Sequence, residues 1–441
     1  MGNSESPRPG TGEDEGIDRR NLFKLGGAAV LGAGVAYIGN RLFEKKPEEG
    51  TKPESLPEAL KVPNFVFGPS LSPENEFVNR PEIFGIIDEA WELLEGEQAG
   101  FKIESSVITQ KREGRKGRNT APKIVQKLRY NVLLAAVDTK EHPDRIEFIK
   151  VDEKGVSSTP GFEVGKGQEL GMGTDYDIVF PERHLVLAIK RALQLGKEFQ
   201  EVISTPYSPN LDTPVVRERG FKYLVENFAA AQNELREKKI QSKAFPGKLV
   251  ADVMPMRVAL ILCMIEHIDP FVFKRKSAAL VKTDSLDSKQ AEKKVMAAMA
   301  NQALTRVGAN RESSFVYAYS KAGAGGLFQF IPPTYRAIRR LYPKAGLIED
   351  FRGGMDDHKN GAMASLLLFD SDLSFVSPEQ RQGLVKNENT LGMYLASSYN
   401  GGAPRTTRTM KNRPTDWPKY VLPETQMYID KFNALSDAFK E

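Results

Sequence analysis

The stretch 320–335 constrains the fold more than any other part of the chain, because small residues, one amide and a helix start lie close together there. Gly323, Gly325 and Gly326 permit positive φ angles and leave room for another segment against the backbone. Gln329 stands among apolar residues, so its amide needs a hydrogen-bond partner once buried. That partner is either a bound polar ligand or the chain itself. The pair Pro332 and Pro333 then predicts the first turn of a helix. We therefore expect a functional site here.

This stretch and its flanks resemble the lytic transglycosylase (SLT) family of goose-type-lysozyme-like enzymes. The family pattern is Glu-Ser-x-Phe followed by Ser-x-x-Gly-Ala-x-Gly-Leu-x-Gln-x-x-Pro-x-Thr, and residues 320–334 match its second part densely. Residues 398–402, Ser-Tyr-Asn-Gly-Gly, are similar to the family's Ala-Tyr-Asn-Ala-Gly, and residues 424–429, Glu-Thr-Gln-Met-Tyr-Ile, to its Glu-Thr-x-x-Tyr-Val. Three ordered blocks are more specific than one glycine motif. The resemblance covers about 250–441 and says nothing about 60–235.

The resemblance implies a mainly α, lysozyme-like domain at 245–441 that cleaves peptidoglycan without water. In the family, one Glu protonates the oxygen between N-acetylmuramic acid and N-acetylglucosamine. It then acts as a base while the C6 hydroxyl closes to a 1,6-anhydro product, so a second carboxylate is not needed. The resemblance carries over Ser320, Gln329, Tyr399 and Asn400 as substrate contacts, although helix capping and core packing are competing roles for Tyr399 and Asn400. It implies no cofactor and no metal.

Two residues are candidates for the catalytic acid, and the sequence leaves both open. Glu312 belongs to the literal family string Glu-Ser-Ser-Phe, but the helix before it, 295–307, is expected to stop at the capping signal 308–310. Glu266 ends the continuous apolar helix 254–265, where burial raises the pKa of a carboxyl and keeps it protonated as an acid needs. If Glu266 is the acid, residues 271–319 contain an insertion and His267 replaces the family's serine. The helix position favours Glu266.

Two other functions remain compatible with these motifs. One is a catalytically inactive glycan-binding or scaffold module of the cell envelope, since the Glu-Ser-x-Phe spacing is one residue short. The other is a lysozyme-like hydrolase that uses water. The expected partner is the peptidoglycan glycan strand, with envelope proteins as further candidates.

The N-terminus predicts export. Residues 1–18 are polar and acidic, and Arg19-Arg20 precede an uncharged Gly/Ala-rich segment that ends at Asn40, which resembles a twin-arginine signal. An uncleaved membrane anchor is the alternative: the uncharged helix falls short of the ~30 Å hydrocarbon core, but Leu42 and Phe43 could extend it. We therefore expect a signal or anchor at 1–40, a linker rich in Pro and Glu at 41–63, and a location in the bacterial periplasm or cell envelope.

The middle of the chain, 64–240, predicts a small α+β domain of unknown role, so the whole protein is expected to be α+β. Periodicity predicts helices and strands there, with helices at 81–97, 181–195 and 213–239 and strands at 101–110, 127–137 and 145–151. The basic run 111–118 is interpreted as a solvated loop.

Charge and ligand patterns exclude other classes of function. A formal net charge of +4 and a pI near 8.8 are too weakly basic to imply nucleic acid, although they suit an anionic envelope polymer. The four histidines are too scattered for a metal-ligand set. The single cysteine, Cys263, lies in an apolar run and is expected to be structural.

Overall fold

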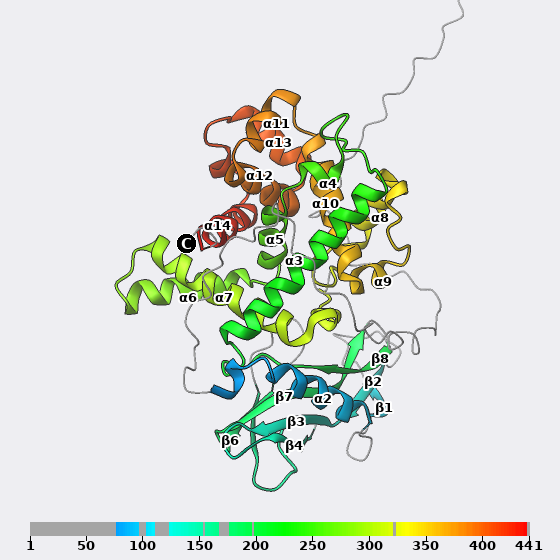
Figure 1. Cartoon of the computed structure of the whole chain (residues 1–441), viewed down its shortest axis with the longest axis vertical. Helices are drawn as coiled ribbons and strands as arrows, with labels where there is room; N and C mark the ends of the chain where they lie inside the picture. The colour runs from blue at the N-terminus through cyan, green and yellow to red at the C-terminus, as the bar shows by residue number, and fades with distance from the viewer. Residues whose placement is uncertain are drawn as a thin grey trace, which may run out of the picture.

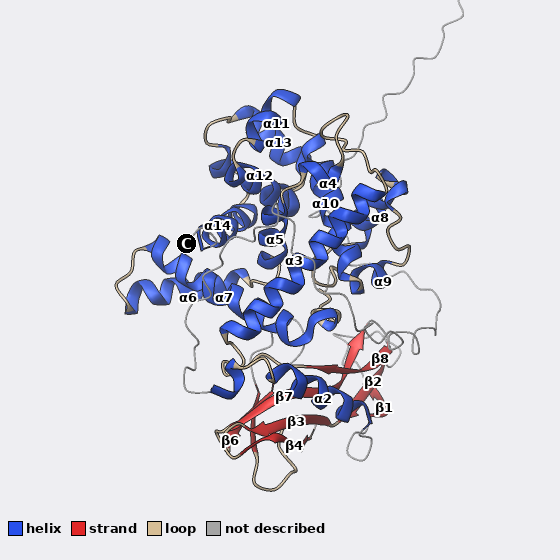
Figure 2. Ribbon diagram, viewed as in Figure 1, coloured by secondary structure: helices blue, strands red, loops and turns tan. Residues whose placement is uncertain are grey.

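The structure is a computed structural model of an α+β protein, with a β-sheet region followed by a larger helical region (Figures 1 and 2). It describes residues 76–96, 103–110, 123–152, 155–166, 176–195, 198–320 and 323–438. The predicted signal, the predicted linker and the basic run 111–118 lie outside these residues. Within them, no helix combines the length and the apolar character needed to cross a membrane.

The β region contains two short helices and eight strands within its described residues. These are η2 Glu76–Asn79, α2 Ile83–Gly96, β1 Ile103–Gln110, β2 Lys123–Tyr130, β3 Val132–Asp138, β4 His142–Val151, β5 Glu163–Lys166, β6 Tyr176–Phe180, β7 His184–Leu195 and β8 Glu198–Ser204.

The helical region runs to the end of the described chain. Its elements are α3 Pro214–Glu237, α4 Val250–Val253, α5 Met256–Ile265, α6 Pro270–Thr283, α7 Ser288–Asn310, η3 Arg311–Ser313, α8 Pro332–Leu341, η4 Pro343–Ala345, α9 Phe351–Asp356, α10 His358–Ser374, α11 Pro378–Val385, α12 Glu388–Gly401, α13 Ala403–Asn412, η5 Trp417–Tyr420 and α14 Pro423–Ala438.

The central sheet is antiparallel, with strand order β4-β3-β7-β8, and β1-β2 and β5-β6 form separate hairpins. Side chains of a strand alternate between the two faces of its sheet. One face, which includes Leu133 and Leu187, packs against α2, and the other, which includes Leu134 and Ile189, packs with β6 residues. The sheet is therefore buried on both faces.

The prediction of a helix at 181–195 is wrong, because this segment forms β7. Its Leu, Ala, Lys, Arg and Gln residues favour a helix intrinsically, but that preference is weak compared with tertiary packing. Leu185 and Leu187 face one apolar layer and Val186 and Ile189 the other, and pairing with β3 and β8 completes the strand. The single strand predicted at 127–137 divides into β2 and β3 on either side of Asn131.

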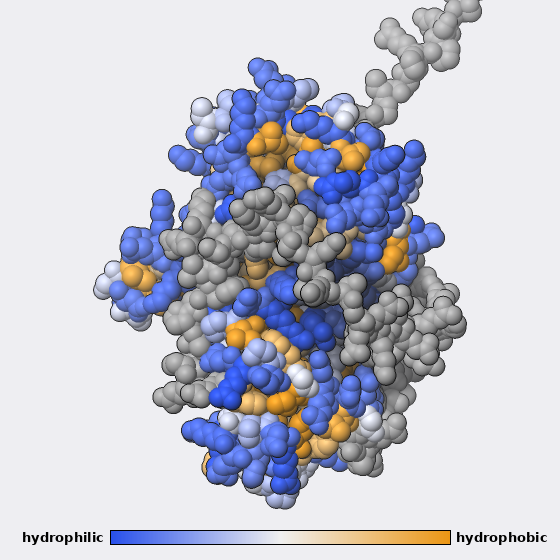
Figure 3. All heavy atoms as spheres, in the orientation of Figure 1, coloured by the Kyte–Doolittle hydropathy of each residue, from blue (hydrophilic) through white to orange (hydrophobic). Residues whose placement is uncertain are grey.

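Helix α5 lies at the centre of the helical region, where residues 258–265 are all buried. Helices α3, α7, α12 and α14 contact it and share one apolar core (Figure 1). A helix that is apolar on every side has to be surrounded in this way. On the face shown in Figure 3, hydrophilic side chains predominate among the coloured residues, with hydrophobic patches between them.

Helix α3 also belongs to this core, whereas the sequence places it at the end of the preceding domain. Phe221, Leu224 and Phe228 pack into the same apolar cluster as α5. The first turn of α3 contacts the β region, since Val216 belongs to the cluster beneath α2. The helical region therefore includes α3 and begins near 214.

Helix α7 continues through Gly308 and ends at Asn310. Gly308 is therefore inside the helix and does not cap its end, contrary to the prediction from the sequence. Gly308 lies where α7 crosses α3, opposite Gly220. A Cβ atom at Gly308 would overlap the carbonyl oxygen of Val216 and lie 3.0 Å from the Gly220 nitrogen. The glycine serves close helix packing, not a left-handed turn.

Asn310, the last residue of α7, joins the two regions. Its Oδ1 accepts from the Thr205 amide at 2.8 Å, and its Nδ2 donates to the Thr205 carbonyl at 3.0 Å. Trp91 of α2 donates to the Thr205 hydroxyl at 2.9 Å. Thr205 directly follows β8, so α2, β8 and α7 meet at one buried residue.

The α3–α7 crossing generates a stability prediction. Gly308→Ala should lower the free energy of unfolding by about 1–3 kcal/mol or more, because the added methyl group meets backbone atoms that cannot rotate away. Urea unfolding of the purified chain measures this. The control is Gly383→Ala in α11, where the added Cβ meets no atom within 4 Å and should increase stability by up to about 1 kcal/mol. Equal effects of the two substitutions would contradict the packing argument.

Candidate functional site

Glu266 lies at the C-terminal end of α5, in the middle of the protein. Pro255 precedes the first turn of α5, and the following apolar residues extend the helix to Ile265, after which Glu266 takes the C-cap position. Glu266 is partly buried, and the Tyr428 hydroxyl of α14 donates to its Oε2 at 3.3 Å. Tyr428 belongs to the block 424–429, so one of the three sequence blocks directly contacts one of the two candidate acids.

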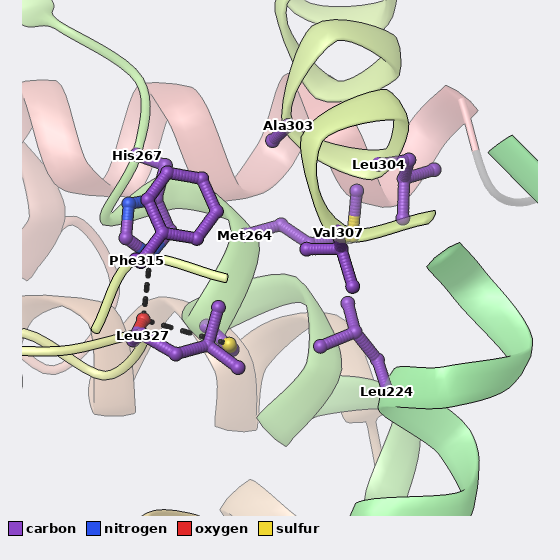
Figure 4. A pocket seen from close by; sticks show the side chains of 9 residues that line it. Leu224, Met264, His267, Ala303, Leu304, Val307, Phe315 and Leu327 are labelled. Carbon is purple, nitrogen blue, oxygen red and sulfur yellow. Dashed lines mark hydrogen bonds between the residues drawn. The ribbon is translucent and has the colours of Figure 1, made fainter. Parts of the chain in front are cut away.

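His267, the next residue, connects α5 to the glycine-containing stretch. Its Nε2 lies 2.6 Å from the Leu327 carbonyl oxygen, and its ring stacks on Phe315 with centroids 3.7 Å apart (Figure 4). Burial lowers the pKa of His267 to about 4, so the ring is neutral at physiological pH. A carbonyl oxygen only accepts, so Nε2 carries the proton and donates to Leu327.

A small apolar cavity lies behind this contact. Side chains from α3, α5 and α7 line it together with His267, Phe315 and Leu327, and its volume is about 10 Å³ (Figure 4). That is close to the minimum space for one water molecule and far too small for a sugar. Cys263 lines the same cavity and is buried without a disulfide, as the sequence predicts.

The second and third family blocks contact each other and the first. The Tyr399 hydroxyl donates to the Phe328 carbonyl, and the Thr425 hydroxyl donates to the Asn400 Oδ1 at 3.0 Å. Both predicted substrate contacts, Tyr399 and Asn400, thus have partners inside the protein. The three blocks, which are separated by up to about a hundred residues in sequence, converge beside the end of α5.

Gln329 and Ser320 also bond within the chain. The Gln329 Nε2 donates to the Ala318 carbonyl at 2.9 Å and to the Gly326 carbonyl at 2.8 Å. The Ser320 hydroxyl accepts from the Ala324 amide at 3.0 Å. Of the two partners that the sequence allows for the Gln329 amide, the structure contains the internal one.

The glycines of this stretch accommodate the protein's own side chains and backbone. A Cβ at Gly325 would collide with the Tyr319 ring, and a Cβ at Gly326 would lie 2.7 Å from the Met355 carbonyl oxygen. Gly323 and Gly326 have positive φ angles of 80° and 70°. The Tyr319 ring therefore lies against Gly325, and Met355 at the end of α9 lies against Gly326.

Glu312 lies apart from this convergence. It is in η3, its side chain is 72% exposed, and its nearest charged partner is Arg311 at 3.7 Å. Arg311 also approaches Asp88 of α2 at 3.3 Å, so Glu312 faces the junction with the β region. Between Glu266 and the glycine stretch the chain forms α6, α7 and η3.

Lys431 of α14 is a residue of this region that the sequence-based site does not include. It is 1% exposed, and its Nζ donates to the carbonyls of Ile265 at 2.7 Å and Ile268 at 3.1 Å. A signal for it exists in the sequence, because Lys431 follows Tyr428 by three residues and precedes Leu435 by four, on the apolar stripe of α14.

Asp356 is a second partly buried carboxyl near the glycine stretch. Burial raises its pKa to about 6, while Arg352 opposes the shift, and the Tyr319 hydroxyl lies 3.5 Å from its Oδ1. No group of three or more His, Cys, Asp or Glu residues is placed to hold a metal ion within the described part of the chain.

Comparisons with known proteins return no match to this chain, whether against family models, curated proteins or solved structures. The assignment therefore depends on the geometry of the chain itself.

His358 generates a prediction about pH. It is 3% exposed, with Nε2 2.9 Å from the Ser314 carbonyl and Nδ1 2.9 Å from the Tyr223 hydroxyl, and burial lowers its pKa to about 4. Between pH 6.5 and 4 the unfolded chain binds the proton and the folded chain does not, so stability falls as pH falls through this window. His358 alone should account for a loss of roughly 3 kcal/mol.

Chemical unfolding of His358→Gln between pH 7 and pH 4 should show a smaller loss than the unmodified chain. His142 is exposed on β4, so His142→Gln should retain the full loss and serves as the control. Identical pH dependence in all three proteins would show that His358 is not the titrating group.

Proposed function

We propose that this chain is an exported lytic transglycosylase whose helical region has a lysozyme-like fold and cleaves peptidoglycan. The observation that carries the proposal is the contact between Tyr428 and Glu266 at 3.3 Å. It joins the third family block to a carboxyl at the end of a buried helix, beside the first and second blocks.

Glu266 is the general acid in this proposal. Its carboxyl donates a proton to the oxygen between N-acetylmuramic acid and N-acetylglucosamine as that bond breaks. The resulting carboxylate then accepts the proton of the C6 hydroxyl while the C6 oxygen bonds to C1 of the same sugar, which gives the 1,6-anhydro end. No water is consumed, and Glu266 returns to its starting form. The Tyr428 hydroxyl orients the carboxyl through its bond to Oε2.

The position of Glu312 supports this assignment. A general acid has to reach the scissile oxygen and benefits from a desolvated setting that raises its pKa. The side chain of Glu312 is 72% exposed and pairs with Arg311, whereas Glu266 is partly buried against α14. The string Glu-Ser-Ser-Phe at 312–315 therefore has a structural role near His358, because the Ser314 carbonyl bonds to that ring.

An inactive glycan-binding or scaffold module is the second candidate, and one observation favours it. Ser320, Gln329, Tyr399 and Asn400 all hydrogen-bond within the chain. Residues that contact sugars need donors and acceptors directed toward the ligand, so this pattern weakens the case for all four carried-over contacts.

Glu266→Gln and Glu312→Gln test the assignment, with each variant first checked for an unchanged thermal midpoint. Loss of a general acid typically costs on the order of 10² to 10⁴ in rate, so Glu266→Gln should nearly abolish release of soluble muropeptides. Glu312→Gln should retain the normal rate, because its side chain is exposed. Release is measured by chromatography of digested cell walls.

Mass spectrometry of the products separates the alternatives. Muropeptides with 1,6-anhydro ends support the transglycosylase, reducing muramic ends a hydrolase, and intact glycan the scaffold module. Loss of activity in Glu312→Gln alone would reverse the assignment. Full activity in both variants would move the acid elsewhere, and Asp356, with its raised pKa of about 6, would be tested next.

A further inference from the structure

We propose that Lys431 is a positioning residue, which clamps the end of α5 and holds a buried positive charge beside the turn that carries Glu266. The clamp itself is a feature of the structure. Its catalytic meaning rests on the proposed function of Glu266.

The geometry of the clamp comes from two backbone carbonyls on either side of Glu266. The last carbonyls of a helix have no partners within that helix. The Lys431 Nζ donates to the carbonyl of Ile265, the last residue of α5, at 2.7 Å, and to that of Ile268 at 3.1 Å. Glu266 and His267 form the turn between these carbonyls, so one ammonium group bridges the start and end of the turn that carries the candidate acid.

Two residues of α14, Tyr428 and Lys431, contact Glu266 and the backbone beside it. Tyr428 and Lys431 are three residues apart and therefore lie on the same face of α14. The Tyr428 hydroxyl bonds to Glu266, and its ring lies 4.3 Å from the Lys431 Nζ. A shift of α14 would move both contacts together, so this helix sets the position of the carboxyl.

The charge of Lys431 lies beside the turn that carries Glu266, because its Nζ donates to the carbonyl of Ile265, the residue before Glu266, at 2.7 Å. The titratable groups around the pair are Cys263, His267 and Asp269 on the α5 side, with Tyr428 and Lys431 on α14. Burial lowers the pKa of Lys431 to about 8, and the charges of Glu266 and Asp269 oppose that shift. Below pH 8 the ammonium is present, and an adjacent positive charge favours the carboxylate form of Glu266.

Two consequences follow for the ionisation of Glu266. Replacing Lys431 with an uncharged residue should raise the pKa of Glu266. In the unmodified chain, the loss of the Lys431 proton near pH 8 should also shift the carboxyl signal of Glu266, because interacting groups titrate as a pair.

The first test uses the unmodified full chain and does not depend on activity. Carboxyl ¹³C NMR of glutamate-labelled protein follows Glu266 from pH 3 to pH 10, with the signal assigned by its absence in Glu266→Gln. We expect the Glu266 carboxyl chemical shift to change once as Glu266 itself titrates and a second time, by less, near pH 8. Lys431→Met should lose the second step and shift the first to higher pH. A Glu266 signal with no step near pH 8 in the unmodified chain would overturn the proposal, even if Lys431→Met fails to fold.

The second test measures the pH dependence of cell-wall lysis. A general acid is lost as pH rises through its pKa, so the alkaline limb of the profile should move to higher pH in Lys431→Met. The maximal rate should fall on the order of 10- to 100-fold as the turn loosens. Lys431→Arg retains the charge and should restore the alkaline limb toward its original pH. Lys419→Met, at an exposed lysine, is the control and should leave both quantities unchanged.

The two tests separate this inference from the proposed function. Absence of lysis by the unmodified chain at every pH, with the NMR coupling present, would refute the proposed function and leave the clamp supported. Normal lysis with an unchanged alkaline limb in folded Lys431→Met would refute the inference alone.

Discussion

The burial of α5 is the constraint on which the rest of the helical region depends. A helix that is apolar on all sides is stable only when other helices surround it, and α3, α7, α12 and α14 provide that shell. Burial creates a second requirement at its C-terminal end, where the unpaired carbonyls need donors that water cannot easily supply. Lys431 supplies them for Ile265 and Ile268. The end of α5 at Glu266 is therefore a polar point inside an apolar core.

The same end of α5 collects segments that are far apart in sequence. His267 bonds to Leu327, Tyr399 to Phe328, and Tyr428 to Glu266. Each bond satisfies a buried polar group, which would otherwise cost free energy, so the convergence stabilises the fold as well as forming a candidate site. This double role explains why the side chains expected to contact substrate have partners within the protein.

The placement of α7 against α3 and the β region depends on close backbone packing as well as on polar contacts. Gly220 and Gly308 let α3 and α7 approach until a Cβ atom on Gly220 would lie 2.8 Å from the Gly308 nitrogen. Asn310 then anchors the end of α7 to Thr205 beside the sheet. Because α7 is fixed at both contacts, Glu312, which follows it in η3, is carried to the surface, whereas Ser314 and Phe315 of the same string are buried.

The sequence by itself determined the α+β class, the apolar helix that ends at Glu266, the structural cysteine and the three ordered blocks, since these follow from local periodicity and short motifs. It misassigned β7 because helix propensity is weak when both faces of a segment find apolar partners in a sheet. It read Gly308 as a helix end because only the crossing with α3 shows why a glycine is needed there. Tertiary structure alone left Glu266 partly buried and Glu312 exposed, and brought Lys431 to the end of α5. Burial and hydrogen-bond partners depend on segments remote in the chain, and no local pattern encodes those distances.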